Sequence, residues 1–246
     1  MACNIVVSTG AGISAESGIH TYRDADGLWT KHDPMEVSHI QGWIKNPQKV
    51  LDFKNAQRRL STEGEYRPNA AHLALTRLQA EWRWGDVMIV TQNIDGLHAA
   101  AGSRVLAIHG SIAEKFCTAC GHVSPFDADI VLTDPCRSCG KPATTRPHVV
   151  MFGEMPFHLD QVEGALRRCG IFAAIGTSDE VAPANQFVQR VRSSETYRIN
   201  LASLTAGGGW YRHQRIGRAT VEVPRWVDEL LALRDEPVIP ENRGIG

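Results

Sequence analysis

The chain lacks an excess of charge of either sign, and it lacks any long apolar run. Its 26 basic and 27 acidic residues give a formal net charge of −1, so bulk electrostatics favours neither nucleic acid nor an anionic membrane as a partner. No apolar run approaches the ~20 residues that a membrane-spanning helix needs. An apolar strand follows almost directly after the first residue, which leaves no room for a signal peptide. We therefore expect a cytoplasmic protein.

The sequence also lacks internal repeats, low-complexity segments and any obvious Ser-His-Asp or Cys-His arrangement of the kind that activates a nucleophile. Without such a nucleophile, the chemistry that fits best is one in which a cofactor and a substrate react directly. The protein then supplies their relative position and a general base.

What is present indicates an α/β protein. The 246 residues suffice for one sizeable core and a smaller module. Short apolar runs alternate with helical patterns, which predicts a Rossmann-like parallel sheet with helices on both faces. We expect its strands at residues 5–7, 87–90, 105–108, 171–175, 197–201 and 219–223, and helices after Asn69, at 159–168, at 185–192 and around 226–231.

Two segments depart from this alternation. Residues 31–68 carry apolar residues at helical spacing between prolines and predict a helical insert. Residues 114–145 contain four of the six cysteines and predict a small zinc-ribbon module. The main domain is then expected to comprise residues 1–30, 69–113 and 146–246.

Small or polar residues end nearly every predicted strand. Ligands of a parallel α/β sheet bind beyond the carboxyl ends of its strands. We therefore expect these residues to converge on one crevice. They are Gly10, Gln92 to Asp95, His109, Gly176 to Ser178, and Asn200.

The first strand leads into Gly10-Ala11-Gly12, part of a dinucleotide-binding fingerprint in which Ala15 replaces the third glycine. Glycines bring backbone N–H groups close to a phosphate because no Cβ intervenes. Taken alone, the motif fits a tight strand-to-helix connection without a ligand equally well. The polar ends of the other strands favour the ligand-binding interpretation.

The clustered cysteines form two pairs, Cys117 with Cys120 and Cys136 with Cys139, and 15 residues separate the pairs. Two such turns supply the four corners of a tetrahedron around zinc. Four thiolates leave no open position for water, so the predicted site is structural rather than catalytic. The other two cysteines are expected to be small buried residues.

Among the ten histidines, His109 has the position of a general base. It follows an apolar strand and precedes Gly110, so its ring is expected to point from the strand end into the crevice. Neutral imidazole is the usual general base near pH 7. Asn93 and Asp95 are candidates to orient a ribose or an amide, and Asn200 is the candidate for the adenine ribose. The other histidines are interpreted as structural.

These segments together resemble the sirtuin family over nearly the whole chain. The resemblance is closest to the bacterial class III branch, whose members share the sequence Ala-Glu-Ser-Gly found here at residues 15–18. The segments that carry it are Gly10–Ile19, Thr91–His98, His109-Gly110, the cysteine pairs, Arg146–Glu154, Gly176–Ser178, Asn200 and Ala219.

The resemblance implies removal of acyl groups from protein lysines with NAD as cosubstrate and one structural zinc ion. Nicotinamide leaves, the acyl oxygen attacks the ribose carbon, and the acyl group passes to ADP-ribose. His109 is then the general base on a ribose hydroxyl. Asn93 and Asp95 position nicotinamide, ribose and an attacking water.

The resemblance also assigns residues to the two ligands. Those assigned to NAD are Gly10, Ala11, Gly12, Ser14, Ala15, Glu16, Tyr22, Arg23, Trp29, Gln92, Asn93, Ile94, Asp95, Gly176, Thr177, Ser178, Asn200 and Ala219. Those assigned to the acylated peptide, which is expected to add as a strand at a sheet edge, are Lys54, Gln57, Val150, Phe152, Gly153 and Glu154. Tyr22 and Arg23 are expected to cover the nicotinamide side.

One departure from the class III pattern concerns the acyl group. That branch typically carries a Tyr-x-x-Arg pair that binds the carboxylate of succinyl or malonyl groups. Lys54 stands at the tyrosine position and Gln57 at the arginine position. A lysine is a poorer match for a carboxylate than the guanidinium fork. We therefore expect acetyl or other neutral acyl groups to be removed at least as well as succinyl groups.

Two other functions use the same crevice. A mono-ADP-ribosyltransferase would take the same cofactor, but it would not need His109 as a deacylation base. A non-enzymatic module for NAD sensing or zinc-mediated docking would need neither His109 nor the polar residues Gln92, Asn93 and Asp95.

Overall fold

The computed structural model describes residues 2–19, 32–63, 66–178, 184–192, 195–203 and 208–233. Tyr22, Arg23 and Trp29, which the sequence assigns to the cofactor, lie outside these residues. Within them, no helix combines the length and the apolar character that crossing a membrane would require.

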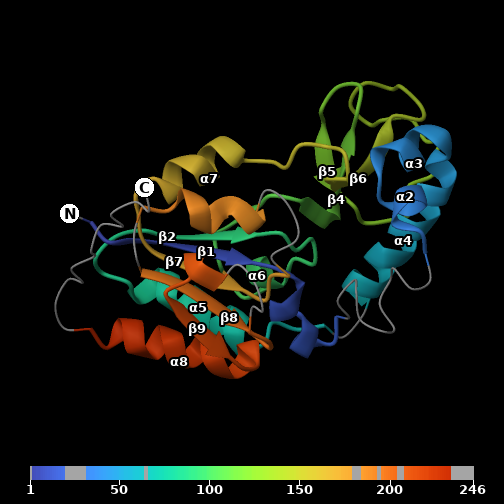
Figure 1. Ribbon diagram of the computed structural model, residues 1–246. Helices are drawn as coiled ribbons and strands as arrows, with labels where there is room; N and C mark the ends of the chain where they lie inside the picture. Colours follow the sequence, from blue (N-terminus) through green and yellow to red (C-terminus); the bar gives the residue numbers. More distant parts are fainter. Residues whose placement is uncertain are drawn as a thin grey trace.

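The main sheet has six parallel strands in the order β3-β2-β1-β7-β8-β9 (Figure 1). From β1 the chain adds β2 and β3 on one side and later β7, β8 and β9 on the other, so the winding reverses between β1 and β7. The predicted Rossmann-like sheet is confirmed. The strands are β1 (Asn4–Thr9), β2 (Val87–Thr91), β3 (Val105–Ala107), β7 (Cys169–Ile175), β8 (Glu195–Asn200) and β9 (His213–Ile216).

Helices cover both faces of this sheet. On one face, α5 (Ala70–Glu81) and α8 (Ala219–Leu231) pack over Ile5 and Val7 of β1. On the other face, α7 (Leu159–Leu166) and the 3₁₀ helix η3 (Ala184–Arg190) pack over Val6 and Phe172. Burial on both faces explains why β1 and β7 read as continuous apolar runs. The predicted 185–192 helix is thus a 3₁₀ helix.

The predicted cap at Asn69 is confirmed. Its side chain accepts a hydrogen bond from Ala71 N, and His72 completes a reciprocal capping box at the start of α5. The remaining short helices are η1 (Ala11–Ile13), η2 (Ala15–Ser17), α6 (Leu97–Ala100) and η4 (Gly208–Trp210).

The strand predicted at 219–223 is wrong, because these residues begin α8. Alternating valines suggest a strand locally. Over a longer window, however, Ala219, Val223, Trp226 and Leu230 recur at helical spacing and are all buried against the sheet and α5. The sixth strand is β9, a mostly polar edge strand beside β8.

A second, smaller unit surrounds the cysteines (Figure 1). It contains an antiparallel sheet in the order β5-β4-β6, and α4 packs against β4 and β6. Asn55 of α4 exchanges hydrogen bonds with the main chain of Ile130, which ties the insert to the cysteine segment. The elements are α2 (Pro34–Val37), α3 (Ile40–Lys45), α4 (Pro47–Glu63), β4 (Gly110–Cys117), β5 (Val123–Pro125) and β6 (Thr145–Val149).

The two loops that follow β1 and β7 touch through their main chains. Gly12 N donates to Gly176 O at 2.9 Å. A Cβ at Gly12 would lie 2.7 Å from Gly176 Cα, closer than any real contact of that kind. Gly176 itself has φ +61, a conformation that favours glycine. Both positions therefore require glycine for this approach.

We expect the substitution Gly12→Ala to lower the free energy of unfolding by about 1–3 kcal/mol, since the added methyl overpacks two backbones that cannot turn aside. Urea unfolding followed by circular dichroism measures this change. Gly164→Ala in α7 is the matched control, because its nearest new neighbour is the flexible end of Arg168 at 3.9 Å. A Gly12→Ala variant as stable as this control would contradict the prediction.

Candidate functional site

A row of hydrogen bonds joins the ends of the central strands. Gln92 N, after β2, donates to Thr9 O at 2.9 Å, and Gly10 N donates to Ile175 O at 3.0 Å. After β8, the Asn200 side chain donates from Nδ2 to Thr177 O at 2.7 Å. These strand ends, predicted to converge, lie together where the winding of the sheet reverses. This is the place where open α/β sheets bind ligands.

Asn93 connects two of these loops. Its side-chain nitrogen Nδ2 lies 3.1 Å from Gly10 O and 3.1 Å from Ser14 Oγ, while its main-chain N donates to Thr91 Oγ1. The amide is therefore held with its Nδ2 toward the glycine loop. The predicted grouping of Asn93 with Gly10 and Ser14 is present in the structure.

His109 lies just beyond β3, and its ring is oriented by one contact. Nδ1 is 2.9 Å from Gln92 O. A carbonyl oxygen only accepts hydrogen bonds, so Nδ1 carries the proton and Nε2 of the neutral ring is an acceptor. Burial lowers the pKa of His109 below its usual value, while the bond to Gln92 O opposes that effect. The imidazole is thus neutral at pH 7 and suited to take a proton through Nε2.

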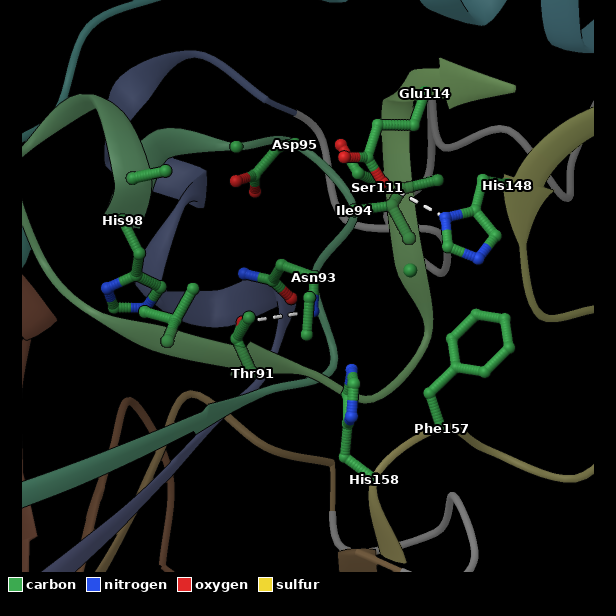
Figure 2. A pocket seen from close by; sticks show the side chains of 15 residues that line it. Thr91, Asn93, Ile94, Asp95, His98, Ser111, Glu114, His148, Phe157 and His158 are labelled. Atoms are coloured by element: carbon green, nitrogen blue, oxygen red, sulfur yellow. Dashed lines mark hydrogen bonds and ion pairs between the residues drawn. The ribbon is translucent and has the colours of Figure 1, made fainter. Parts of the chain in front are cut away.

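Asp95 and Asn93 also form one wall of a cavity of about 240 Å³. The cavity lies beside β3, and its other wall includes Glu114 and His148, whose Oε2 and Nδ1 are 3.0 Å apart (Figure 2). Asp95 Oδ1 accepts a hydrogen bond from Leu97 N at the start of α6. One carboxylate oxygen of Asp95 therefore holds the local fold.

Two buried histidines contact the end of β1 and the glycine loop that follows it. His98 Nε2 lies 3.0 Å from Thr9 Oγ1, and the His72 ring contacts Ser14 Oγ at 3.5 Å. The two rings pack edge to face, and their centroids are 4.8 Å apart. Burial lowers the pKa of His98 to about 3 and also lowers that of His72. Both rings are neutral at pH 7 and act as structural residues.

Glu16, which the sequence assigns to the cofactor, lies against the start of α8, the helix that begins at Ala219. The Glu16 carboxylate accepts hydrogen bonds from Thr220 N at 3.0 Å and Thr220 Oγ1 at 2.8 Å. It thereby satisfies an N–H group at the start of α8, where the residue before the helix provides no side-chain cap. Sequence reasoning missed this role because the partners are 204 positions apart.

Lys54 and Gln57 contact each other on α4, where Lys54 Nζ donates to Gln57 Oε1 at 3.1 Å. The Lys54 side chain is buried, and burial lowers its pKa to about 8. Arg58, the next residue along α4 after Gln57, pairs with Asp129 at 3.2 Å. Among the described residues, Lys54 therefore has no carboxylate partner, whereas Arg58 has one.

The segment assigned to the peptide lies next to the histidine. Val150 N donates to His109 O at 2.9 Å. Phe152 is half exposed, and Gly153 has φ +88. The Glu154 carboxylate, by contrast, is bonded to Arg146 rather than presented to a ligand. Ile94 follows the end of β2, and Ser178 follows the end of β7.

The four predicted metal ligands come together in the smaller unit, and their sulfur atoms all lie within 4.8 Å of one another. Cys117 Sγ is 3.8 Å from Cys139 Sγ, and Cys120 Sγ is 3.9 Å from Cys136 Sγ. Zinc–sulfur bonds of about 2.3 Å place tetrahedral sulfurs about 3.8 Å apart, whereas a disulfide needs about 2.05 Å. The donor set therefore fits one structural zinc ion.

The amino-acid sequence matches a known protein family and its curated members. A model of the Sir2 family matches residues 10–183. The chain is 44% identical over 232 residues to an NAD-dependent protein deacylase of Vibrio vulnificus (strain YJ016), covering 93% of this chain and 94% of that protein.

Solved structures show the same architecture. A Sir2 homologue in complex with NAD superimposes with a TM-score of 0.80 at 31% identity, over 94% of this chain and 91% of that one. The structure of Sir2Af2 bound to a myristoylated histone peptide matches with a TM-score of 0.69 at 28% identity, over 93% of this chain and 91% of that one.

We expect Cys120→Ser to remove the metal and to lower the midpoint of thermal unfolding, because a structural zinc ion contributes directly to folding. Zinc per chain, measured by atomic absorption, should fall from one to well below one. Cys3→Ala is the control, since Cys3 is buried in the main core and should leave the zinc content unchanged. Retention of a full zinc equivalent by Cys120→Ser would contradict the assignment.

Proposed function

The chain belongs to the Sir2 family, and from this premise we propose that it is an NAD-dependent protein deacylase acting on acylated lysine side chains. The observation that supports this activity most directly is the state of His109. Its Nδ1 proton is held by Gln92 O, its ring is neutral at pH 7, and its Nε2 has no hydrogen-bond partner among the described residues and can accept a proton. A mono-ADP-ribosyltransferase or an NAD sensor would not need this base.

The loops at the strand ends are proposed to hold NAD. The glycine loop suits its phosphates because glycine lets a ligand come close to the main chain, while the N–H groups of Gly10 and Gly12 themselves hold the loop against Ile175 O and Gly176 O. Asn200 and Thr177, which are joined by a hydrogen bond, are proposed to contact the adenosine end. When bound, NAD supplies the ribose carbon that the acyl oxygen attacks, and its ADP-ribose portion receives the acyl group.

Asn93, Asp95 and His109 are proposed to form the reacting end of the site. Contacts to Gly10 and Ser14 orient the Asn93 amide, which suits it to position the ribose or a water molecule. One oxygen of Asp95 is engaged with Leu97 N, so the other is available to the nicotinamide side. His109 takes the proton of a ribose hydroxyl through Nε2. The cytoplasmic location expected from the sequence stays a prediction.

We expect His109→Ala to lower the deacylation rate by about 10²–10⁴-fold, the usual contribution of a general base. Mass spectrometry of an acetyl-lysine peptide incubated with enzyme and NAD measures loss of the acyl group. The same spectra distinguish ADP-ribosyl transfer, in which the peptide gains mass. His213→Ala on the edge strand β9 is the control and should retain the rate within about twofold.

The pH profile tests the same base. Burial lowers the pKa of His109, so the base stays unprotonated on acidification past 6.5, the pKa of an ordinary histidine. The rate is therefore expected to hold at pH 6.5 and to decline only below it. A rate already half lost at pH 6.5 or above would contradict His109 as the buried base.

We expect acetyl and butyryl peptides to be deacylated at least as fast as a succinyl peptide of the same sequence. The Lys54 ammonium is a point charge with a pKa lowered to about 8, and Gln57 supplies no guanidinium fork. Lys54→Tyr combined with Gln57→Arg restores the Tyr-x-x-Arg pair and should shift selectivity toward succinyl. A wild-type preference for succinyl above tenfold would refute the expectation.

A further inference from the structure

Both oxygens of the Glu154 carboxylate are used inside the protein. Oε1 accepts a hydrogen bond from Arg146 Nη2 at 2.5 Å, and Oε2 accepts one from Met151 N at 2.8 Å. Glu154 N in turn donates to Met151 O at 3.0 Å. One carboxylate therefore closes the turn from Met151 to Glu154 and anchors it to β6, the strand that carries Arg146.

The ion pair is well shielded from water. The side chains of Arg146 and Glu154 are 7% and 23% exposed, and the guanidinium lies over the ring of Phe116 at 4.8 Å. Arg146 Nη1 is buried and has no hydrogen-bond partner among the described residues. Loss of the carboxylate would leave a buried cation without compensation, so the pair strongly favours one conformation of the turn.

The same turn is joined to the base and to the helical insert. Val150 N donates to His109 O at 2.9 Å. Phe152 N donates to Ser38 O at 2.8 Å, and Ile40 N donates to Phe152 O at 3.0 Å. The main chains of Val150 and Phe152 are thus committed to neighbouring elements. The position of the turn is defined relative to His109.

Gly153 is what this arrangement leaves open. Its main-chain N–H and C=O make no hydrogen bond within the described part of the chain, and the nearby Phe152 and Met155 are 48% and 76% exposed. At φ +88, a Cβ would lie 3.0 Å from Ile40 Cγ2 and 3.2 Å from His39 Nε2. An extended peptide could pair with this open main chain, and the exposed apolar side chains would flank it.

We propose that Arg146 and Glu154 are a positioning pair for the acylated peptide: they hold the Met151–Glu154 turn so that the Gly153 main chain pairs with the peptide beside His109. This inference rests on the proposed deacylase function. It replaces the expected role of Glu154 as a direct substrate contact. Neither residue touches the reacting atoms, so their loss weakens peptide capture more than the chemical step.

The test compares Glu154→Ala, Glu154→Gln and Asp129→Asn in steady-state deacylation of an acetyl-lysine peptide at saturating NAD. Glu154→Ala removes both hydrogen bonds that the carboxylate accepts and should raise the peptide KM at least tenfold, while kcat falls less than threefold. Glu154→Gln keeps an oxygen for Met151 N and should raise KM by an intermediate factor. Asp129→Asn breaks the Arg58–Asp129 ion pair elsewhere in the smaller unit and should leave KM within twofold.

Thermal unfolding of all three variants separates positioning from stability. A role in stability alone predicts that Glu154→Ala lowers the unfolding midpoint with KM within twofold of wild type, and this result would overturn the proposal. So would an equal rise of KM in Asp129→Asn. Binding of a fluorescent acetyl-lysine peptide to wild-type enzyme isolates the premise: if the wild type neither binds nor deacylates it, the proposed function itself fails.

Discussion

The close approach of two main chains at the ends of β1 and β7 is the constraint on which the site depends. Gly12 and Gly176 meet with no room for a Cβ on either side. This contact brings the loop after β1 against the loop after β7, at the point where the winding of the sheet reverses. The polar ends of β2, β3 and β8 then reach the same place through hydrogen bonds among these loops.

Most polar side chains around the site serve the fold. Glu16 satisfies the start of α8, Glu154 closes its turn, and His72 and His98 stay neutral under the glycine loop. Buried polar groups are costly unless they are paired. Among the described residues, Nε2 of His109 and the second oxygen of Asp95 keep no partner, since His109 Nδ1 and Asp95 Oδ1 are already engaged. Most of the polar groups around the proposed base are thus already paired within the protein.

Local patterns predicted the parts of the protein that depend on neighbours in sequence. Apolar runs located five of the six strands of the main sheet, and the cysteine spacing located four sulfur atoms that cluster as zinc ligands. The Asn69 cap was also read correctly. The failure at 219–223 has the same origin. A five-residue window holds the alternation of a strand, whereas the helical period of α8 emerges only over thirteen residues.

The sequence by itself determined the class of fold and the zinc ligands, and it singled out His109 as the candidate base, because strand period, turn glycines and ligand spacing are encoded within a few residues. Tertiary structure alone decided the state and the roles of the side chains. Burial sets the protonation of His109 and Lys54, and the partners of Glu16 and Glu154 lie on other elements. Desolvation and long-range pairing arise only when distant segments pack, so no local pattern records them.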